Sequence, residues 1–271
     1  MHQSFADGLR DWRRRRGLSQ LRLGLEADVS ARHIAFLETG RSSPTPAMVV
    51  RLAEALEVPL SDRNALLAAA GFAAAYGHRD LGADEMAVYR QAMEWTLRRH
   101  DPYPAMAIDR QWRLAALNAA ADRLLRPAGL SIGVSLIEGL LAPGPLKAAI
   151  ANWPEVAEHL ATRLRTESRH ADGNRALEDA ARRLQAEAGE RPARRGPLPA
   201  AVPTRFRIGD VELALVSTIA QFSSAEDIAL ADLRIELLFP ADEATRLALV
   251  AAAGDADNGS IADRASDTLG G

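Results

Sequence analysis

The first 75 residues combine apolar positions at helical spacing with short capping and turn signals. The predicted helices run from Phe5 to Arg15, from Ser19 to Ala27, from Ser30 to Gly40, from Thr45-Pro46 to Leu56 and from Ser61 to about Gly71. Ser19 and Ser30 are the expected N-caps, and Gly17 and Gly40 are expected to end the helices before them. Five helices in about 70 residues are enough for a complete small domain.

The apolar period changes after Tyr103, where alternation replaces helical spacing. The predicted strands are Ala105–Ile108, Trp112–Leu117, Thr204–Ile208, Val211–Phe222 and Leu233–Phe239. The predicted helices of this half cover residues 85–100, 119–126, 145–170 and 174–188, and residues 192–199 are expected to form a loop. Gly209-Asp210 is a hairpin signal. The second half is therefore predicted to be an α+β domain with about five antiparallel strands.

A length of 271 residues suggests two domains. We expect an all-α domain over residues 1–75, a linker over 76–84, the α+β domain over 85–250 and a disordered polar tail over 251–271. The chain has no cysteine, which excludes disulfides and thiolate metal sites. No apolar run approaches the roughly 20 residues that span a bilayer, and the N-terminus lacks an apolar signal core. We therefore expect a cytoplasmic protein without a membrane partner.

Charge is distributed unevenly along the chain. Residues 1–41 hold eight arginines and five acidic residues, a net charge of +3, whereas the whole chain carries a net charge of -3. A basic first segment on an acidic body indicates that a polyanion binds to the first segment alone.

The strongest motif spans residues 17–41, where two predicted helices are separated by a turn of three to four residues. This arrangement, preceded by a basic helix, predicts a helix-turn-helix. Small Ala27 is expected to let the two helices approach closely. The apolar residues expected to pack the two helices together are Leu25, Val29, Ile34 and Leu37.

DNA contacts are expected on the outer face of the second motif helix and at the ends of the motif. An arginine there can bind guanine through two hydrogen bonds, and an apolar ring can contact a thymine methyl group. Gln20 at a helix N-terminus and Arg41 and Ser42 in the following loop suit phosphate contacts. The predicted DNA-binding residues are Gln20, Ser30, Ala31, Arg32, His33, Phe36, Arg41 and Ser42. The alternative is a plain helical hairpin with a solvated basic face.

These residues resemble a known family. Residues 5–72 are similar to the helix-turn-helix domain of XRE-family regulators, which resemble phage repressors. The stretches RHIAFLETGRSSPTPAMVVRLAEALEVPLSDRNALLAAAGF, YPAMAIDRQWRLAALNAAADRLL, NWPEVAEHLATRLR and LADLRIELLFPADEAT resemble regulators whose second half is an MmyB-like ligand-binding domain. The resemblance implies a PAS-like second domain that binds a fatty acid or another apolar ligand. It maps the family's base-reading positions onto Ala31, Arg32, His33 and Phe36, with Ala31 where phage repressors often have glutamine.

The candidate ligand pocket of the second domain is apolar, and most of its residues are also expected core residues. The candidates are Trp95, Met106, Ile108, Trp112, Leu114, Leu136, Trp153, Phe206, Leu215 and Phe222. The tryptophans at 95, 112 and 153 are expected around one sheet, beside alanines that leave space. Asn118 is either a helix cap, which we favour, or a ligand contact. Arg163 either binds a carboxylate head group or lies on a solvated helix face, the interpretation we favour.

Catalytic signals are absent from the sequence. The six histidines are scattered, and no HExxH, GxSxG, GxxxxGK[ST] or GxGxxG motif occurs. No cofactor or metal is predicted apart from a bound fatty acid or similar ligand. We therefore expect a homodimeric transcriptional regulator that binds double-stranded DNA and senses an apolar small molecule. In the alternative, the PAS-like domain binds no ligand and serves dimerisation or partner docking. An enzyme fused to a DNA-binding domain is the third hypothesis.

Overall fold

The computed structural model describes residues 4–170, 174–189, 201–223 and 225–254. They form two compact units. The described residues of the first unit are 4–79, 163–170, 174–179 and 225–231, and those of the second are 80–162, 180–189, 201–223 and 232–254. The predicted loop at 192–199 and the predicted tail from residue 255 onward lie outside the described residues.

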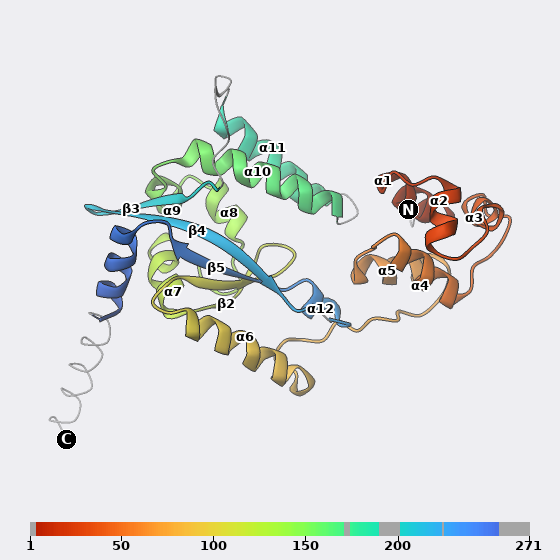
Figure 1. The fold of residues 1–271 in the computed structure, drawn as a ribbon, viewed down its shortest axis with the longest axis horizontal. Helices are drawn as coiled ribbons and strands as arrows, with labels where there is room; N and C mark the ends of the chain where they lie inside the picture. Colours follow the sequence, from red (N-terminus) through yellow and green to blue (C-terminus); the bar gives the residue numbers. More distant parts are fainter. Residues whose placement is uncertain (1–3, 171–173, 190–200, 224, 255–271) are drawn as a thin grey trace. The chain divides into compact units, whose positions relative to one another are not determined.

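The first unit contains the five predicted helices (Figure 1). They are α1 (Phe5–Arg15), α2 (Gln20–Glu26), α3 (Ala31–Glu38), α4 (Pro46–Ala55) and α5 (Leu60–Ala69). The side chains of Ser19, Ser30 and Thr45 each accept a hydrogen bond from a backbone N–H in the first turn, which satisfies a donor that the helix leaves without a partner. The last helix begins at Leu60, because Pro59 occupies the N-cap position in place of the predicted Ser61.

One apolar cluster joins these helices. Ile34 and Leu37 of α3 are buried as predicted, and Leu23 of α2 packs into the same cluster. The other large buried residues of the cluster are Phe5, Leu9, Trp12, Val49, Leu52, Leu56, Val58, Leu66 and Leu67. At about 25 cal/mol per Å² of apolar surface, their burial is the main term that stabilises the helix-turn-helix.

The second unit is built on an antiparallel sheet, as predicted. Its strands are β1 (Ala105–Ile108), β2 (Leu114–Leu117), β3 (Thr204–Ile208), β4 (Val211–Gln221) and β5 (Arg234–Pro240), in the order β2-β1-β5-β4-β3. Trp112 lies outside β2, contrary to the prediction, because its φ of 60° belongs to a turn conformation and not to a strand. The sheet places β1, β5 and β4 between other strands, and every residue of β1 is buried, so both faces of β1 are covered.

The helices outside the helix-turn-helix are η1 (Asp84–Met86), α6 (Ala87–His100), α7 (Ala119–Leu125), η2 (Arg126–Ala128), α8 (Leu136–Leu141), α9 (Pro145–Ala149), α10 (Trp153–His170), α11 (Arg175–Ala188) and α12 (Ile228–Ala231). The pattern did not predict α8 and α12. Residues 243–254 are also helical, so the first four residues assigned to the tail continue a helix.

The single helix predicted over residues 145–170 is divided into α9 and α10. The break is held by β3: the backbone N–H of Ala151 donates to Arg205 at 2.8 Å, and the Asn152 amide binds the backbone of Pro203 and Arg205. These bonds join segments about 50 residues apart in the chain. Helical periodicity alone could therefore not reveal the break.

Different helices pack against the two faces of the sheet. Ala105 and Ala107 of β1 pack in one cluster with Met93 and Leu97 of α6. Because side chains alternate along a strand, Met106 and Ile108 lie on the opposite face. Figure 1 shows α6 on one side of the sheet and α8 and α9 on the other.

Candidate functional site

The turn between α2 and α3 is tight and depends on two residues. The backbone N–H of Val29 donates to the carbonyl of Gly24 at 2.8 Å, and a Cβ on Gly24 would lie only 2.5 Å from the Val29 carbonyl oxygen. Asp28 adopts a φ of 51°, the left-handed region that aspartate tolerates better than most residues. Sequence reasoning attributed the close approach to Ala27. The structure assigns it to Gly24, whose role could have been inferred from a glycine inside a helix.

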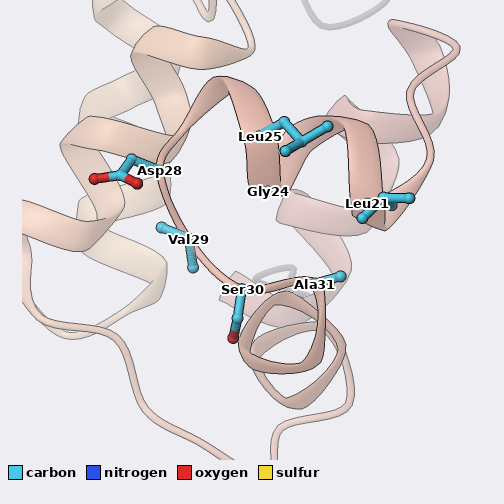
Figure 2. Close-up of a pocket in the computed structure, with 7 residues that line it drawn as sticks. All are labelled: Leu21, Gly24, Leu25, Asp28, Val29, Ser30 and Ala31. Carbon is cyan, nitrogen blue, oxygen red and sulfur yellow. The ribbon is translucent and has the colours of Figure 1, made fainter.

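The prediction that Leu25 joins the two helices is wrong. Leu25 is 69% exposed and Leu21 is 63% exposed, because both lie on the outer side of α2. They line an open hollow of about 320 Å³ above the turn (Figure 2). Its lining residues are Leu21, Gly24, Leu25, Asp28, Val29, Ser30 and Ala31.

The predicted base-reading residues lie along α3. Arg32 is exposed, and Ala31, His33 and Phe36 are half-buried. The Arg32 guanidinium lies 5.3 Å from the centre of the Phe36 ring, one helical turn away. Stacking on a ring limits the conformations of a long arginine side chain and so lowers the entropy lost when it binds. Ser30 accepts a hydrogen bond from the backbone N–H of His33, so its hydroxyl serves as the cap of α3.

The predicted phosphate contacts lie at both ends of the motif. The backbone N–H groups of Arg41 and Ser42 both bond to the carbonyl of Phe36, at 2.9 and 3.3 Å, and this anchors the loop to the end of α3. The Arg41 side chain is exposed. Gln20, at the start of α2, donates from Nε2 to a carboxylate oxygen of Glu38 at 2.9 Å.

Glu38 is the residue that sequence reasoning missed. Its side chain is 2% exposed, and its carboxylate accepts hydrogen bonds from Arg13 at 2.5 Å and 2.8 Å as well as from Gln20. Arg10 donates to its backbone carbonyl. These bonds connect α1, α2 and α3. The available signal was the position of Glu38, four residues after buried Ile34 and so on the inward face of α3.

Burial and ion pairing act on the Glu38 carboxyl in opposite directions. Burial alone would raise its pKa, since a carboxylate is less stable away from water. The hydrogen bonds from Arg13 and Gln20, with the charges of Arg13 and Arg10, outweigh burial and hold the pKa of Glu38 below its usual value. The hydrogen bond to Glu38 raises the pKa of Arg13. Both groups are therefore ionised at neutral pH.

In the second unit, one sheet face collects five of the predicted pocket residues. The strand register places Ile108 opposite Leu114 and Met106 opposite Glu236. The register of β3 and β4 adds Phe206 and Leu215 to this face. The buried members of the face, called the ligand face below, are Met106, Ile108, Leu114, Phe206, Leu213, Leu215 and Glu236. Buried Glu236 thus shares this face with half-buried Arg234, two residues before it on β5.

Two predicted pocket residues lie elsewhere. Phe222 packs edge-to-face on Tyr89 of α6, with ring centres 5.8 Å apart, on the other side of the sheet. Trp95 is 56% exposed on the outer side of α6. The prediction that three tryptophans surround one sheet is therefore wrong, since Trp95 points away from it.

The remaining aromatic candidates hold helices in place. Trp112 is 1% exposed, and its carbonyl accepts the backbone N–H of Leu136, at the start of α8, at 2.8 Å. Leu136 is itself buried. Trp153 is half-buried, donates from Nε1 to Glu187 at 2.9 Å and lies under the ammonium of Lys147. Trp153 thereby ties α9, α10 and α11 together.

Asn118 is a structural cap. Its Oδ1 accepts from Ala105 and Ala121, and its Nδ2 donates to the carbonyls of Leu97 and Tyr103, so all four hydrogen-bonding positions of the amide are occupied. No capacity is left for a ligand, which decides between the two interpretations of this residue. Arg163 pairs with Glu167 of the same helix at 2.9 Å.

Other chemistry is not supported by the described part of the chain. Among those residues, no group of three or more His, Cys, Asp or Glu side chains could hold a metal ion. Across the same residues, no helix is both long and apolar enough to cross a membrane.

Comparison with protein families agrees with both halves of the structure. Residues 89–251 match the model of the MmyB-like transcription regulator ligand binding domain, which is more than half of the chain. Residues 9–62 match a helix-turn-helix model. No curated protein matches the chain. The families are domains of transcription regulators, which points away from an enzyme.

Proposed function

The chain belongs to the family of MmyB-like transcription regulators, and we propose that this DNA-binding regulator acts as a homodimer that senses an apolar small molecule, for which a fatty acid is our first candidate. The observation that carries the DNA-binding part is the arrangement of α3, with exposed Arg32 beside Phe36 on a helix held from behind by buried Ile34 and Leu37. A helix supported in this way can enter a major groove with its outer face toward the bases.

Two arginines divide the proposed interface into base readout and phosphate binding. Arg32 lies on the outer face of α3, where a bidentate contact to guanine is worth about 1–3 kcal/mol of discrimination. Arg41 lies in the loop after α3, where it suits a phosphate contact that carries no sequence information. Loss of Arg32 should therefore relax specificity, whereas loss of Arg41 should weaken binding to all sequences.

The test uses duplexes selected from a random pool by the full-length protein. We expect Arg32→Ala to lose about 1–3 kcal/mol on the selected sequence and to relax the preference at one base pair. Arg41→Ala should lower affinity on every duplex and reduce the slope of log K against log salt by about one unit. Arg123→Ala, an exposed arginine of α7, is the control for lost positive charge. Uniform weakening by Arg32→Ala would contradict the base-reading role, and an unchanged salt slope would contradict the role of Arg41.

The ligand face supports the sensing part of the proposal. Six apolar residues from four strands lie on one side of the sheet, opposite the cluster under α6. Burial of an acyl chain contributes about 0.8 kcal/mol per methylene, so each two added methylenes should strengthen binding roughly tenfold until the chain exceeds the available space. The charged residues of this face, Glu236 and Arg234, lie two residues apart on β5. We therefore expect the apolar residues around them to recognise the acyl chain.

The sensing test is a titration of the full-length protein with fatty acids and the corresponding alcohols of several chain lengths. Tryptophan fluorescence and melting temperature are the readouts, since Trp112 is buried and bonded to the start of α8. We expect both to change with a clear dependence on chain length, and Leu215→Phe, which fills the ligand face without adding a tryptophan, to reduce the change. Arg123→Ala, an exposed residue of α7, serves as the control. Flat titrations for all lengths would favour the alternative, a ligand-free module for dimerisation or partner docking.

A further inference from the structure

Helix α6 has an inner face and an outer face that both carry apolar residues. Met93 and Leu97 face the sheet and are buried. On the opposite side, Val88 is 73% exposed and Trp95 is 56% exposed, with exposed Ala92 between them. Trp95 contributes nothing to the core of its own unit. A large aromatic side chain held out to solvent on a well-packed helix is typical of a binding surface.

The outer residues are spaced nearly symmetrically along α6 and the 3₁₀ turn η1 before it. The stripe consists of Glu85, Val88, Ala92, Trp95 and Arg99, at steps of three, four, three and four residues. Read from the other end, the steps are four, three, four and three. Two copies of the stripe can therefore pack against each other in antiparallel orientation around Ala92, with Trp95 of each copy beside Val88 of the other. A small residue at the centre lets the two helices approach closely.

The charges of the stripe favour the same arrangement. Glu85 stands at its beginning and Arg99 at its end, and neither forms an ion pair with another of the residues that the structure describes. The Arg99 guanidinium lies 5.4 Å from the centre of the Trp95 ring, at the edge of the exposed apolar surface. Antiparallel packing brings Glu85 of each copy opposite Arg99 of the other, which gives two opposite-charge contacts. Parallel packing would place like charges together, which is unfavourable.

We propose that the outer face of α6 is the dimer interface of this regulator, formed with a second copy of the chain in antiparallel orientation about a twofold axis near Ala92. This inference rests on the proposed homodimer and names the surface that forms it. The self-complementary charges select a second copy over an unrelated partner, and the isologous contact is the kind that a twofold dimer requires. A pair of packed helices is a small interface, so we expect a dissociation constant in the micromolar range.

Sedimentation velocity of the full-length protein over a range of concentrations tests the interface. Trp95→Ala should weaken the dimer at least tenfold, whereas Ile132→Ala, which removes an equally exposed apolar side chain elsewhere, should not. Glu85→Arg and Arg99→Glu should each weaken the dimer by creating two like-charge contacts. The double variant Glu85→Arg/Arg99→Glu should restore it, and a mixture of the two single variants should form a heterodimer. Glu94→Arg, off the stripe on the same helix, is the matched control.

The possible outcomes test the α6 interface and the proposed homodimer separately. A wild-type dimer that responds to Trp95→Ala and is restored by the charge reversal supports the proposal. A stable dimer that none of these variants affects overturns the assignment of α6 and leaves the homodimer intact. A chain that stays monomeric at high micromolar concentration overturns both. Circular dichroism of each variant guards against misfolding, and restoration by the double variant cannot result from misfolding.

Discussion

The ion-pair network around Glu38 provides the sharpest stability test of the helix-turn-helix. The perturbation is Glu38→Ala, which removes a carboxylate that is 2% exposed and leaves Arg13, 12% exposed, without its partner. Arg13 keeps one hydrogen bond, from Nη1 to the carbonyl of Leu18 at 2.8 Å. Gln20 also loses its acceptor, so α3 loses its side-chain hydrogen bonds to α1 and α2, while Arg10 keeps its bond to the backbone carbonyl at position 38.

The expected loss follows from burial. Removal of one partner of a buried ion pair costs about 3–5 kcal/mol, because the other charge stays buried and uncompensated. The remaining bond to Leu18 and the slight exposure of Arg13 favour the lower end, about 3 kcal/mol. That value is a large part of the free energy of unfolding of a domain of this size, roughly 4–11 kcal/mol. It corresponds to roughly a hundredfold increase in the population of the open state.

Amide hydrogen exchange read by mass spectrometry measures this effect in α1 and α3 of the full-length protein. Glu38→Ala should reduce protection in both helices by roughly a hundredfold. The control is Glu26→Ala, which breaks the exposed Arg22–Glu26 pair and should change the free energy of unfolding by less than about 0.5 kcal/mol. Arg13→Ala/Glu38→Ala should be less destabilised than the sum of the single variants. Equal effects of Glu38→Ala and Glu26→Ala would refute the reasoning.

Three further predictions concern single residues. Since the pKa of Glu38 is lowered in the folded state, the stabilisation by its carboxylate is complete above the usual pKa of 4.5 and is lost as pH falls through the folded pKa. In urea titrations, the difference in unfolding free energy between wild type and Glu38→Gln should therefore shrink on acidification. A difference that stays constant with pH would contradict the ion pair. Gly24→Ala should destabilise the helix-turn-helix by about 1–2 kcal/mol, because the added Cβ collides with the Val29 carbonyl. It should also weaken DNA binding to the selected duplexes. Helix propensity alone predicts a more stable variant, and that result would contradict the collision. Asn118→Ala should lower the free energy of unfolding by about 3 kcal/mol in thermal denaturation, since it removes the side-chain partner of three buried backbone groups and one half-buried backbone group. A near-neutral effect would show that water replaces the amide.

Local signals predicted most of the secondary structure. The caps at Ser19, Ser30 and Thr45 were predictable, because a cap depends on the residue itself and the next three. The strands Ala105–Ile108 and Thr204–Ile208 were predicted with the bounds that the structure shows, because turn residues or proline flank their apolar positions. Antiparallel pairing followed from the hairpin signals between consecutive strands.

What the sequence could not reveal depends on contacts between distant segments. The break between α9 and α10 is fixed by the bonds from Asn152 to β3, and the local signal for it is confined to Asn152 and Pro154 at the start of α10. The burial of Glu38 requires Arg13 of another helix, whereas a glutamate in a helix is usually exposed. The DNA-binding residues followed from the motif and its resemblance, and the pocket residues could be chosen only as large apolar side chains on strands and helices.

Leu25 and Trp95 were placed wrongly for the same physical reason. Each lies in a helix with apolar residues on both sides, and a periodic pattern cannot show which side faces the core until a partner element is known. In α2 the inward positions belong to Leu23 and Gly24, and in α6 they belong to Met93 and Leu97. The apolar residues left outside are then available for contacts with other molecules, which moves Trp95 from a proposed ligand pocket to a proposed dimer interface.

The two proposed surfaces of the second unit are connected through one strand. Side chains of β1 alternate, so Ala105 and Ala107 contact the inner side of α6 while Met106 and Ile108 belong to the ligand face. An alanine leaves no flexible side chain to absorb a displacement, and packed interiors transmit strain because they have few voids. We therefore expect a ligand that displaces β1 on one face to shift the helix on the other. In a regulator that uses both surfaces, ligand affinity and dimer affinity are coupled by the same factor in both directions, as thermodynamic linkage requires.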